Sequence, residues 1–224
     1  MGLPQGILNE MSDVEPKACA ICGAIYGTEH TFREMMFGTR VPFQYWECIR
    51  CGFLQIVHVP DDLGSFYPAG YYSFAKPFSA WKLLSYRLHF KAAQFLSPLR
   101  KRGGAAFGAV MRADLQRGAR VLDVGCGSGD LVTILRSVGL NAHGIDRFVG
   151  KESAYIRRAT MESVEPGWDL IMFHHALEHM EDQVSVLRYA RDKLNHDGTC
   201  LVRIPIAAWA WEHYRSDFAA APRN

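Results

Sequence analysis

The sequence lacks a long hydrophobic run. No uninterrupted apolar stretch in its 224 residues approaches the roughly 20 residues that a membrane-spanning helix requires. Residues 1–17 also lack the basic start and the apolar core of a signal peptide. We therefore expect a cytoplasmic protein with no membrane span.

An excess of charge of one sign is also missing. The 25 basic and 23 acidic side chains leave a formal net charge of +2, which gives no global reason to expect a nucleic-acid or membrane partner. Internal repeats and low-complexity tracts are absent as well. Because 49% of the residues are apolar, the chain can bury a substantial core, and we expect a folded globular protein.

Local composition divides the chain into four parts. The pattern predicts a loose tail, a small cysteine-bearing module, an aromatic and basic helical linker and an α/β domain. These parts span residues 1–17, 18–64, 65–104 and 105–224, respectively.

The linker contains one predicted helix and an excess of basic residues. The helix runs from about Ser79 to Leu96. Between Lys82 and Arg120 the only acidic residue is Asp114. Such a stretch is most often a solvated helix face, but it would also suit a nucleotide-linked sugar, a lipid-linked phosphate or RNA. The apolar residues at helical spacing are Trp81, Leu84, Leu88 and Phe95.

Cysteine is scarce, and four of the six cysteines form two close pairs. Both pairs have the form Cys-x-x-Cys-Gly, which provides the four thiolates that a tetrahedral structural zinc ion requires. A site with four protein ligands leaves no position for a catalytic water, so its role would be structural or in recognition. The alternative is four free cysteines in a core. The predicted ligands are Cys19, Cys22, Cys48 and Cys51.

The other two cysteines lie beside predicted strands. Cys126 and Cys200 have apolar neighbours, and we expect both to be small buried hydrophobic residues.

After about residue 105, strand and helix patterns alternate. This alternation predicts a parallel sheet covered by helices. The turn-forming residues 195–198 precede the last strand. Predicted strands span 120–124, 141–146, 155–158, 169–173 and 199–204, and predicted helices span 130–138 and 183–194.

A glycine-rich loop connects the first of these strands to the following helix. Glycine permits tight turns and a close approach of the backbone to a ligand, so a nucleotide-type cofactor is expected here. A dinucleotide-binding loop has the form Gly-x-Gly-x-x-Gly. Asp130 occupies the position of its last glycine, which argues against NAD.

The run Asp123-x-Gly125-x-Gly127-x-Gly129 resembles the first motif of the class I S-adenosylmethionine (SAM)-dependent methyltransferases. The resemblance implies that Asp123 binds the ammonium group of SAM and that Asp146 accepts hydrogen bonds from the ribose. It also implies contacts from the loop, from the segment beside adenine and from the end of the fourth strand. These further cofactor contacts are Gly125, Cys126, Gly127, Gly129, Met161, Glu162 and His174.

Residues 175–179 include candidate metal-binding and catalytic side chains. They spell His-x-x-Glu-His, the inverted zinc-protease signature. That site needs both histidines on a helix, whereas these follow a strand directly. The carboxyl ends of parallel strands line ligand crevices, so His175, Glu178 and His179 are candidate catalytic residues. A histidine there suits a general base, although Glu178 and His179 would equally suit a role in fixing the loop.

The four-cysteine module, the aromatic linker and the SAM motif together resemble bacterial zinc-ribbon methyltransferases, including sugar C-methyltransferases. The fold implied is a Rossmann-like α/β sheet with a small N-terminal zinc ribbon. Because that domain normally has seven strands and this sequence ends soon after the fifth, the resemblance also implies that the last strands are missing. The implied activity is SAM-dependent methyl transfer to a small polar metabolite, such as a sugar or a biosynthetic intermediate. RNA methylation or an inactive binding module remains an alternative.

Overall fold

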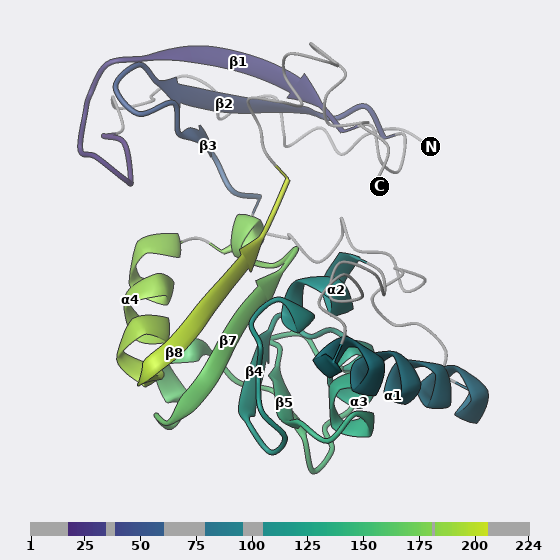
Figure 1. The fold of residues 1–224 in the computed structure, drawn as a ribbon. Coiled ribbons are helices and arrows are strands. Elements are labelled where there is room, and N and C mark those ends of the chain that lie inside the picture. The colour runs from purple at the N-terminus through teal and green to yellow at the C-terminus, as the bar shows by residue number, and fades with distance from the viewer. Residues whose placement is uncertain (1–17, 35–38, 61–78, 96–104, 181, 206–224) are drawn as a thin grey trace. The chain divides into compact units, whose positions relative to one another are not determined.

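The computed structural model describes residues 18–34, 39–60, 79–95, 105–180 and 182–205 (Figure 1). The chain forms two compact units, one containing the described residues up to 60 and the other those from 79 to 205. Within these ranges, no helix has the length and apolar composition needed to cross a bilayer.

The first unit contains a three-stranded antiparallel sheet. Strands β1 (Gly27–Arg33), β2 (Pro42–Cys48) and β3 (Leu54–Ile56) pair in the order β1-β2-β3. Phe32 is buried in this unit, and its ring centroid lies 5.3 Å from that of Tyr45 on the neighbouring strand. The aromatic-rich run 41–47 predicts β2 from the sequence. Strand β1 carries mainly polar residues and β3 has only three residues, so neither is predictable in this way.

The second unit contains a parallel five-stranded sheet. It consists of β4 (Arg120–Val124), β5 (Asn141–Ile145), β6 (Ile156–Arg157), β7 (Trp168–His174) and β8 (Leu194–Arg203), in the order β6-β5-β4-β7-β8. The strand order reverses between β4 and β7, and ligands of such sheets bind outside the carboxyl ends of the strands at that point. The predicted Rossmann-like α/β fold is therefore confirmed.

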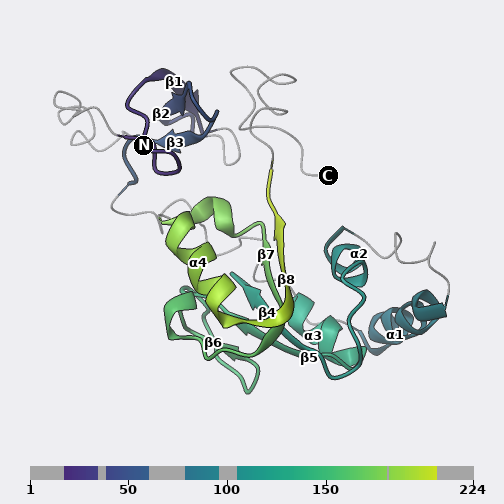
Figure 2. The ribbon, with the colours of Figure 1, turned by 60° about the vertical axis from the view of Figure 1, so that its left-hand side comes forward.

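Helices cover both faces of this sheet (Figures 1 and 2). Alternate residues of β7 enter two separate core clusters: Leu170 and Met172 enter one, and Ile171 and Phe173 the other. All four side chains are completely buried, which explains why β7 is a continuous apolar run. The helices are α1 (Ala80–Phe95), α2 (Ala105–Met111), α3 (Asp130–Ser137) and α4 (Gln183–Lys193), with short 3₁₀ turns η4 (Met161–Ser163) and η5 (Leu177–His179).

Helix α1 packs with a face other than the one that the sequence pattern emphasised. Its packed residues are Leu83, Tyr86 and Phe90, which contact the cluster that includes α3. The three residues at helical spacing that the sequence drew attention to are exposed: Trp81, Leu84 and Leu88 have exposed fractions of 82%, 42% and 61%. The side chain of Phe95 lies outside the described ones.

The last strand differs from the prediction in its start and in its burial. Strand β8 begins at Leu194 and not after the turn, because Leu194 already pairs with Trp168, and residues 195–198 form a bulge before pairing resumes at Thr199. The expectation that Cys200 is buried is wrong. Cys200 is exposed on β8, the edge strand of the described sheet.

Candidate functional site

The glycine-rich loop follows β4 and lies at the point where the strand order reverses. The backbone amides of Gly125 and Cys126 donate to the carbonyl oxygen of Ile145, at 2.8 and 3.2 Å. Gly125 has φ +76°, and a Cβ at this position would collide with Ala176. Glycine is therefore required at 125 both for its backbone conformation and for the packing of the loop against the end of β7.

Asp146 follows β5 and anchors the same loop. Its carboxylate accepts hydrogen bonds from the amide of Gly127 at 3.0 Å and from the amide of Phe148 at 2.7 Å. A carboxylate has about four lone-pair directions, so these two bonds leave capacity for further donors. The carboxylate expected to bind ribose is thus held beside the second glycine of the motif.

Asp123 is the buried acid of the loop. It lies at the end of β4 with an exposed fraction of 3%, the one buried charged residue among those described. Burial, followed by the negative charge of Asp146, raises the pKa of Asp123 to about 7 from its ordinary value of 3.8. A cation bound nearby would favour the ionised carboxylate and reverse this shift.

The side chain of Cys126 packs against the sheet. Its sulfur packs against β5, where a Cβ on Gly144 would lie 2.5 Å from it. Burial, then the charges of Asp123 and Asp146, raises the pKa of the Cys126 thiol. The thiol is therefore unsuited to act as a nucleophile.

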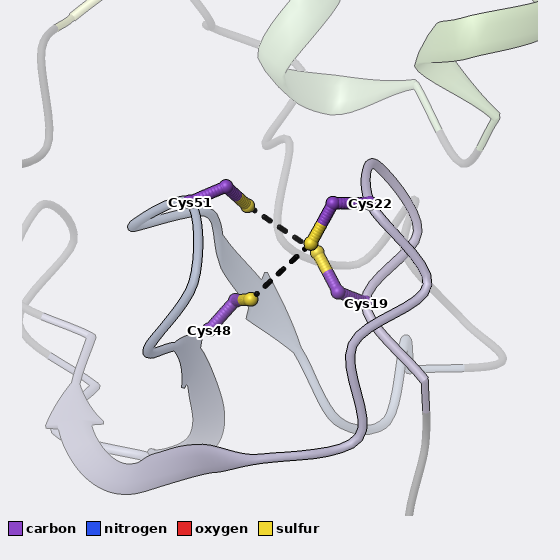
Figure 3. A group of neighbouring side chains, drawn as sticks. All are labelled: Cys19, Cys22, Cys48 and Cys51. Carbon is purple, nitrogen blue, oxygen red and sulfur yellow. Dashed lines mark hydrogen bonds between the residues drawn. The ribbon is translucent and has the colours of Figure 1, made fainter.

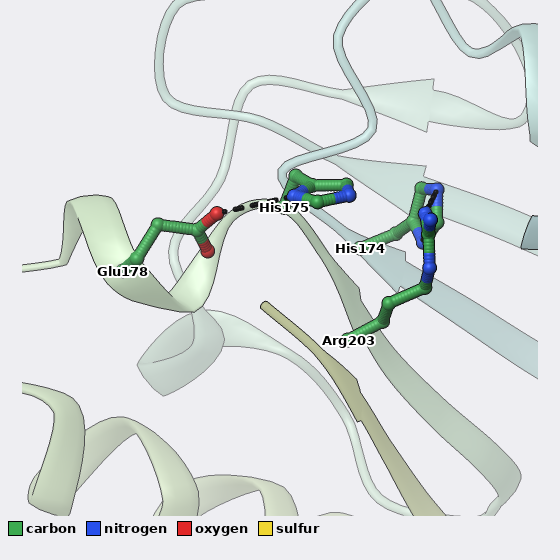
Figure 4. Close-up of polar contacts among 4 residues, drawn as sticks. All are labelled: His174, His175, Glu178 and Arg203. Atoms are coloured by element: carbon green, nitrogen blue, oxygen red, sulfur yellow. Dashed lines mark hydrogen bonds and ion pairs between the residues drawn. The ribbon is translucent and has the colours of Figure 1, made fainter. Parts of the chain in front are cut away.

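The end of β7 presents a histidine and a carboxylate together (Figure 4). His175 has a left-handed φ of +53°, a conformation that costs a residue other than glycine about 1 kcal/mol or more. Its Nδ1 lies 3.4 Å from Oε1 of Glu178. The second carboxylate oxygen of Glu178, Oε2, is buried and has no hydrogen-bond partner among the described residues.

Arg203, at the end of β8, is a site residue that the sequence interpretation missed. Its Nη1 donates to Nε2 of His174 at 2.9 Å (Figure 4). Burial first, and then the positive charge of Arg203, lowers the pKa of His174 to about 4, so His174 is neutral and accepts this bond. The rule that selected His174, a polar residue at the end of a parallel strand, applies equally to Arg203.

Three predicted site residues lie apart from these contacts. Met161 is buried in the core cluster on the α4 side of the sheet, and Glu162 beside it is exposed. His179 is exposed at the end of η5, where its amide donates to the carbonyl of Ala176. The roles assigned to these three side chains stay predictions.

The four paired cysteines converge in the first unit (Figure 3). Their sulfur atoms all lie within 4.8 Å of one another, and the Cys19–Cys51 and Cys22–Cys48 sulfur distances are 3.6 and 3.5 Å. Four sulfurs at the usual Zn–S distance around a tetrahedral ion are about 3.8 Å apart. The four sulfur atoms are therefore a donor set close to what a tetrahedral zinc ion requires.

Both Cys-x-x-Cys segments have the same backbone geometry. The amides of Gly23 and Gly52 donate to the carbonyls of Cys19 and Cys48, at 2.9 and 2.8 Å. Both glycines have φ +70° and open space where a Cβ would be, so their conformation alone favours glycine.

The pKa of one of these four thiols is lowered. Burial raises the pKa of Cys19, but hydrogen bonds from the Cys22 and Ile21 backbone and from the thiols of Cys51 and Cys22 together outweigh it and lower the pKa to about 7. One cysteine of the cluster is thus prepared for the thiolate form that metals bind.

The zinc-protease interpretation of residues 175–179 is not supported. His175 precedes the 3₁₀ turn η5 and His179 is its last residue, so the two do not share the face of an α-helix. Within the described ranges, the cysteine cluster is the only group of side chains arranged to hold a metal ion.

Comparison with known proteins places the α/β unit in a family. Residues 91–223, more than half of the chain, match the family described as methyltransferase domain. The chain belongs to this family. The predicted class of SAM-dependent methyltransferase is confirmed, whereas no curated protein matches the chain.

Solved structures similar to this chain include three methyltransferases. A putative methyltransferase from an antibiotic biosynthesis pathway of Anabaena variabilis is 16% identical, with a TM-score of 0.38, over 50% of this chain and 52% of its own. The plantazolicin methyltransferase in complex with S-adenosylhomocysteine (SAH) is 14% identical, with a TM-score of 0.38, over 65% and 60%. The mitomycin 7-O-methyltransferase is 18% identical, with a TM-score of 0.35, over 62% and 55%. The chain thus spans about half the length of the first of these proteins.

Proposed function

We propose that this protein transfers the methyl group of SAM to a small polar metabolite, such as a sugar or a biosynthetic intermediate. The observation that supports this most directly is the contact between the two functional segments. Gly125 of the glycine-rich loop packs on Ala176, the residue after His175. A cofactor on the loop would therefore lie beside the His175–Glu178 pair.

The cofactor site that we propose consists of the loop and its two acids. Asp123 would receive the ammonium group, because a buried carboxyl with a raised pKa gains most from a cation. Asp146 would receive the ribose hydroxyls with its remaining lone pairs. The loop backbone from Gly125 to Gly129 would lie against the methionine part, Met161 and Glu162 beside adenine and His174 near the methyl end. When bound, SAM supplies an electrophilic methyl group on a sulfonium.

His175 is our candidate general base. Its Nδ1 faces Glu178, which leaves Nε2 to receive the proton that the acceptor atom loses on methylation. Glu178 would hold the imidazole in the required tautomer with one oxygen. His179 is a second candidate at this loop.

The zinc site would be structural. All four ligand positions of the cysteine cluster are supplied by the protein, so zinc there would fix the sheet β1-β2-β3 and leave no coordination position for a substrate.

Substitution of the proposed base separates binding from chemistry. We expect His175→Gln to lower the turnover of methyl transfer by about 10²- to 10⁴-fold, with SAH affinity within about threefold of the wild type. The assay is mass spectrometry of candidate small acceptors and of structured RNA, each incubated with methyl-labelled SAM. Full turnover in His175→Gln would exclude the base role. Label that enters only RNA would show that the acceptor class is wrong.

A further inference from the structure

Helix α1 carries a second apolar face that no described residue covers. Trp81, Leu84 and Leu88 are spaced i, i+3 and i+7, so they form one stripe along the helix. Their exposed fractions are 82%, 42% and 61%. Such large apolar groups gathered on one surface mark an interaction site more often than scattered exposed residues do.

The stripe points away from the α/β unit. At about 100° per residue, it lies opposite the face formed by Leu83, Tyr86 and Phe90, which packs into the core. The side chain of Arg87 further fixes the helix, because its Nε donates to the carbonyl oxygen of Ser137 at the end of α3 at 2.6 Å. The orientation of α1 on its own unit is therefore set from the packed side.

One basic residue lies directly beside the stripe. Lys91 is exposed and about 50° around the helix from the centre of the stripe. Arg87, one turn before it, is held on α3 by Ser137, and the exposed Lys82 lies on the opposite flank, nearer the packed face. Helix α1 contains no aspartate or glutamate. Its outer surface therefore combines an apolar strip with positive charge alone.

We propose that this face of α1 docks on a bilayer that contains anionic phospholipids. The helix would lie parallel to the bilayer surface, with Trp81, Leu84 and Leu88 at the level of the acyl–headgroup boundary and the basic side chains at the phosphates. Tryptophan and leucine between basic residues are the composition of interfacial helices.

This docking does not depend on the methyl acceptor or on the cofactor. It uses residues outside the proposed catalytic and SAM-binding sets, so a failed methyl-transfer assay and a failed docking assay have separate meanings. It concerns association with a surface and requires no helix that spans the membrane.

The test is sedimentation of the full-length protein with vesicles. We expect binding to vesicles of phosphatidylcholine with about one-third phosphatidylglycerol, and weaker binding to phosphatidylcholine alone, because each lysine or arginine near an anionic surface contributes about fivefold in affinity. Raising the salt concentration to about 0.5 M should reduce the difference between the two vesicle types, because exposed charges are then screened.

Matched variants locate the contact. Leu88→Gln should weaken binding about tenfold, because it removes apolar area from the bilayer. Leu187→Gln, which changes an exposed leucine on α4, should leave binding unchanged. Lys91→Gln should weaken binding about fivefold, and Lys151→Gln, at an exposed position outside α1, should have no effect.

Circular dichroism and urea denaturation of every variant verify that the α/β unit is folded. Equal binding to both vesicle types, or equal effects of Leu88→Gln and Leu187→Gln, would overturn the proposal. So would a dimer in solution that Leu88→Gln converts to monomer without any vesicle binding, because the stripe would then be a contact between copies of this chain.

Discussion

Cofactor binding is predicted to release a proton from Asp123. The pKa of Asp123 is raised to about 7 by burial and by Asp146, so below that pH the carboxyl is neutral in the free protein. The ammonium group of SAH favours the ionised form, and binding then requires loss of the proton. We expect SAH affinity to increase about twentyfold from about pH 5.5 to about pH 7.5 and to level off above the pKa.

The variant Asp123→Asn removes this titration. Its SAH affinity should be lower than that of the wild type at about pH 7.5 and nearly independent of pH, because an amide neither ionises nor attracts the ammonium group. Calorimetry in two buffers of different ionisation enthalpy measures the proton released directly. Wild-type affinity that is flat with pH, or a variant with the same pH profile as the wild type, would refute the assignment of Asp123 as the ammonium partner.

The same shift has a consequence for stability. Because the folded-state pKa of Asp123 lies above its ordinary value of 3.8, its stability contribution is fully present below about pH 4 and is lost as the pH rises through about 7. The shift of about three pKa units corresponds to about 4 kcal/mol, and a buried amide without partners costs about 1–3 kcal/mol. Asp123→Asn should therefore raise the free energy of unfolding by about 1–3 kcal/mol at about pH 8, measured by urea denaturation.

Three further substitutions test the site and the metal module. Gly125→Ala should lower the free energy of unfolding by about 1–3 kcal/mol and weaken SAH binding, whereas Gly150→Ala, in open space without a positive φ, should be neutral; equal melting temperatures would contradict this. Cys48→Ser should abolish zinc retention in elemental analysis, and a full equivalent of bound zinc would contradict the four-cysteine site. Arg203→Gln should raise the pKa of His174 from about 4 toward its ordinary value in an NMR titration, and an unchanged pKa would show that Arg203 does not hold it down.

The α/β unit was largely predictable from the sequence because its strands are buried on both faces. Continuous apolar runs at β4 and β7 and the Gly125–Gly129 loop each have one structural interpretation, and their order along the chain implies a parallel sheet. The bulge before Thr199 was not predictable, because it depends on the pairing of Leu194 with Trp168. The exposure of Cys200 depends in the same way on the place of β8 at the edge of the described sheet.

The site was predictable in its residue types but not in its pairings. Strand-end position selected His174, His175 and Glu178, whereas the backbone conformation of His175 and the contact of Arg203 with His174 arise from tertiary packing. Helix α1 has apolar residues on two faces, and periodicity alone does not tell which face packs.

The most direct test of the proposed function is mass spectrometry of small polar acceptors, sugars first, incubated with the protein and methyl-labelled SAM. We expect one labelled methyl group on an acceptor with the wild type and none with Asp146→Ala, because that variant lacks the carboxylate that anchors Gly127. Binding of SAM without label on any small acceptor, or equal labelling by Asp146→Ala, would contradict methyl transfer at this site.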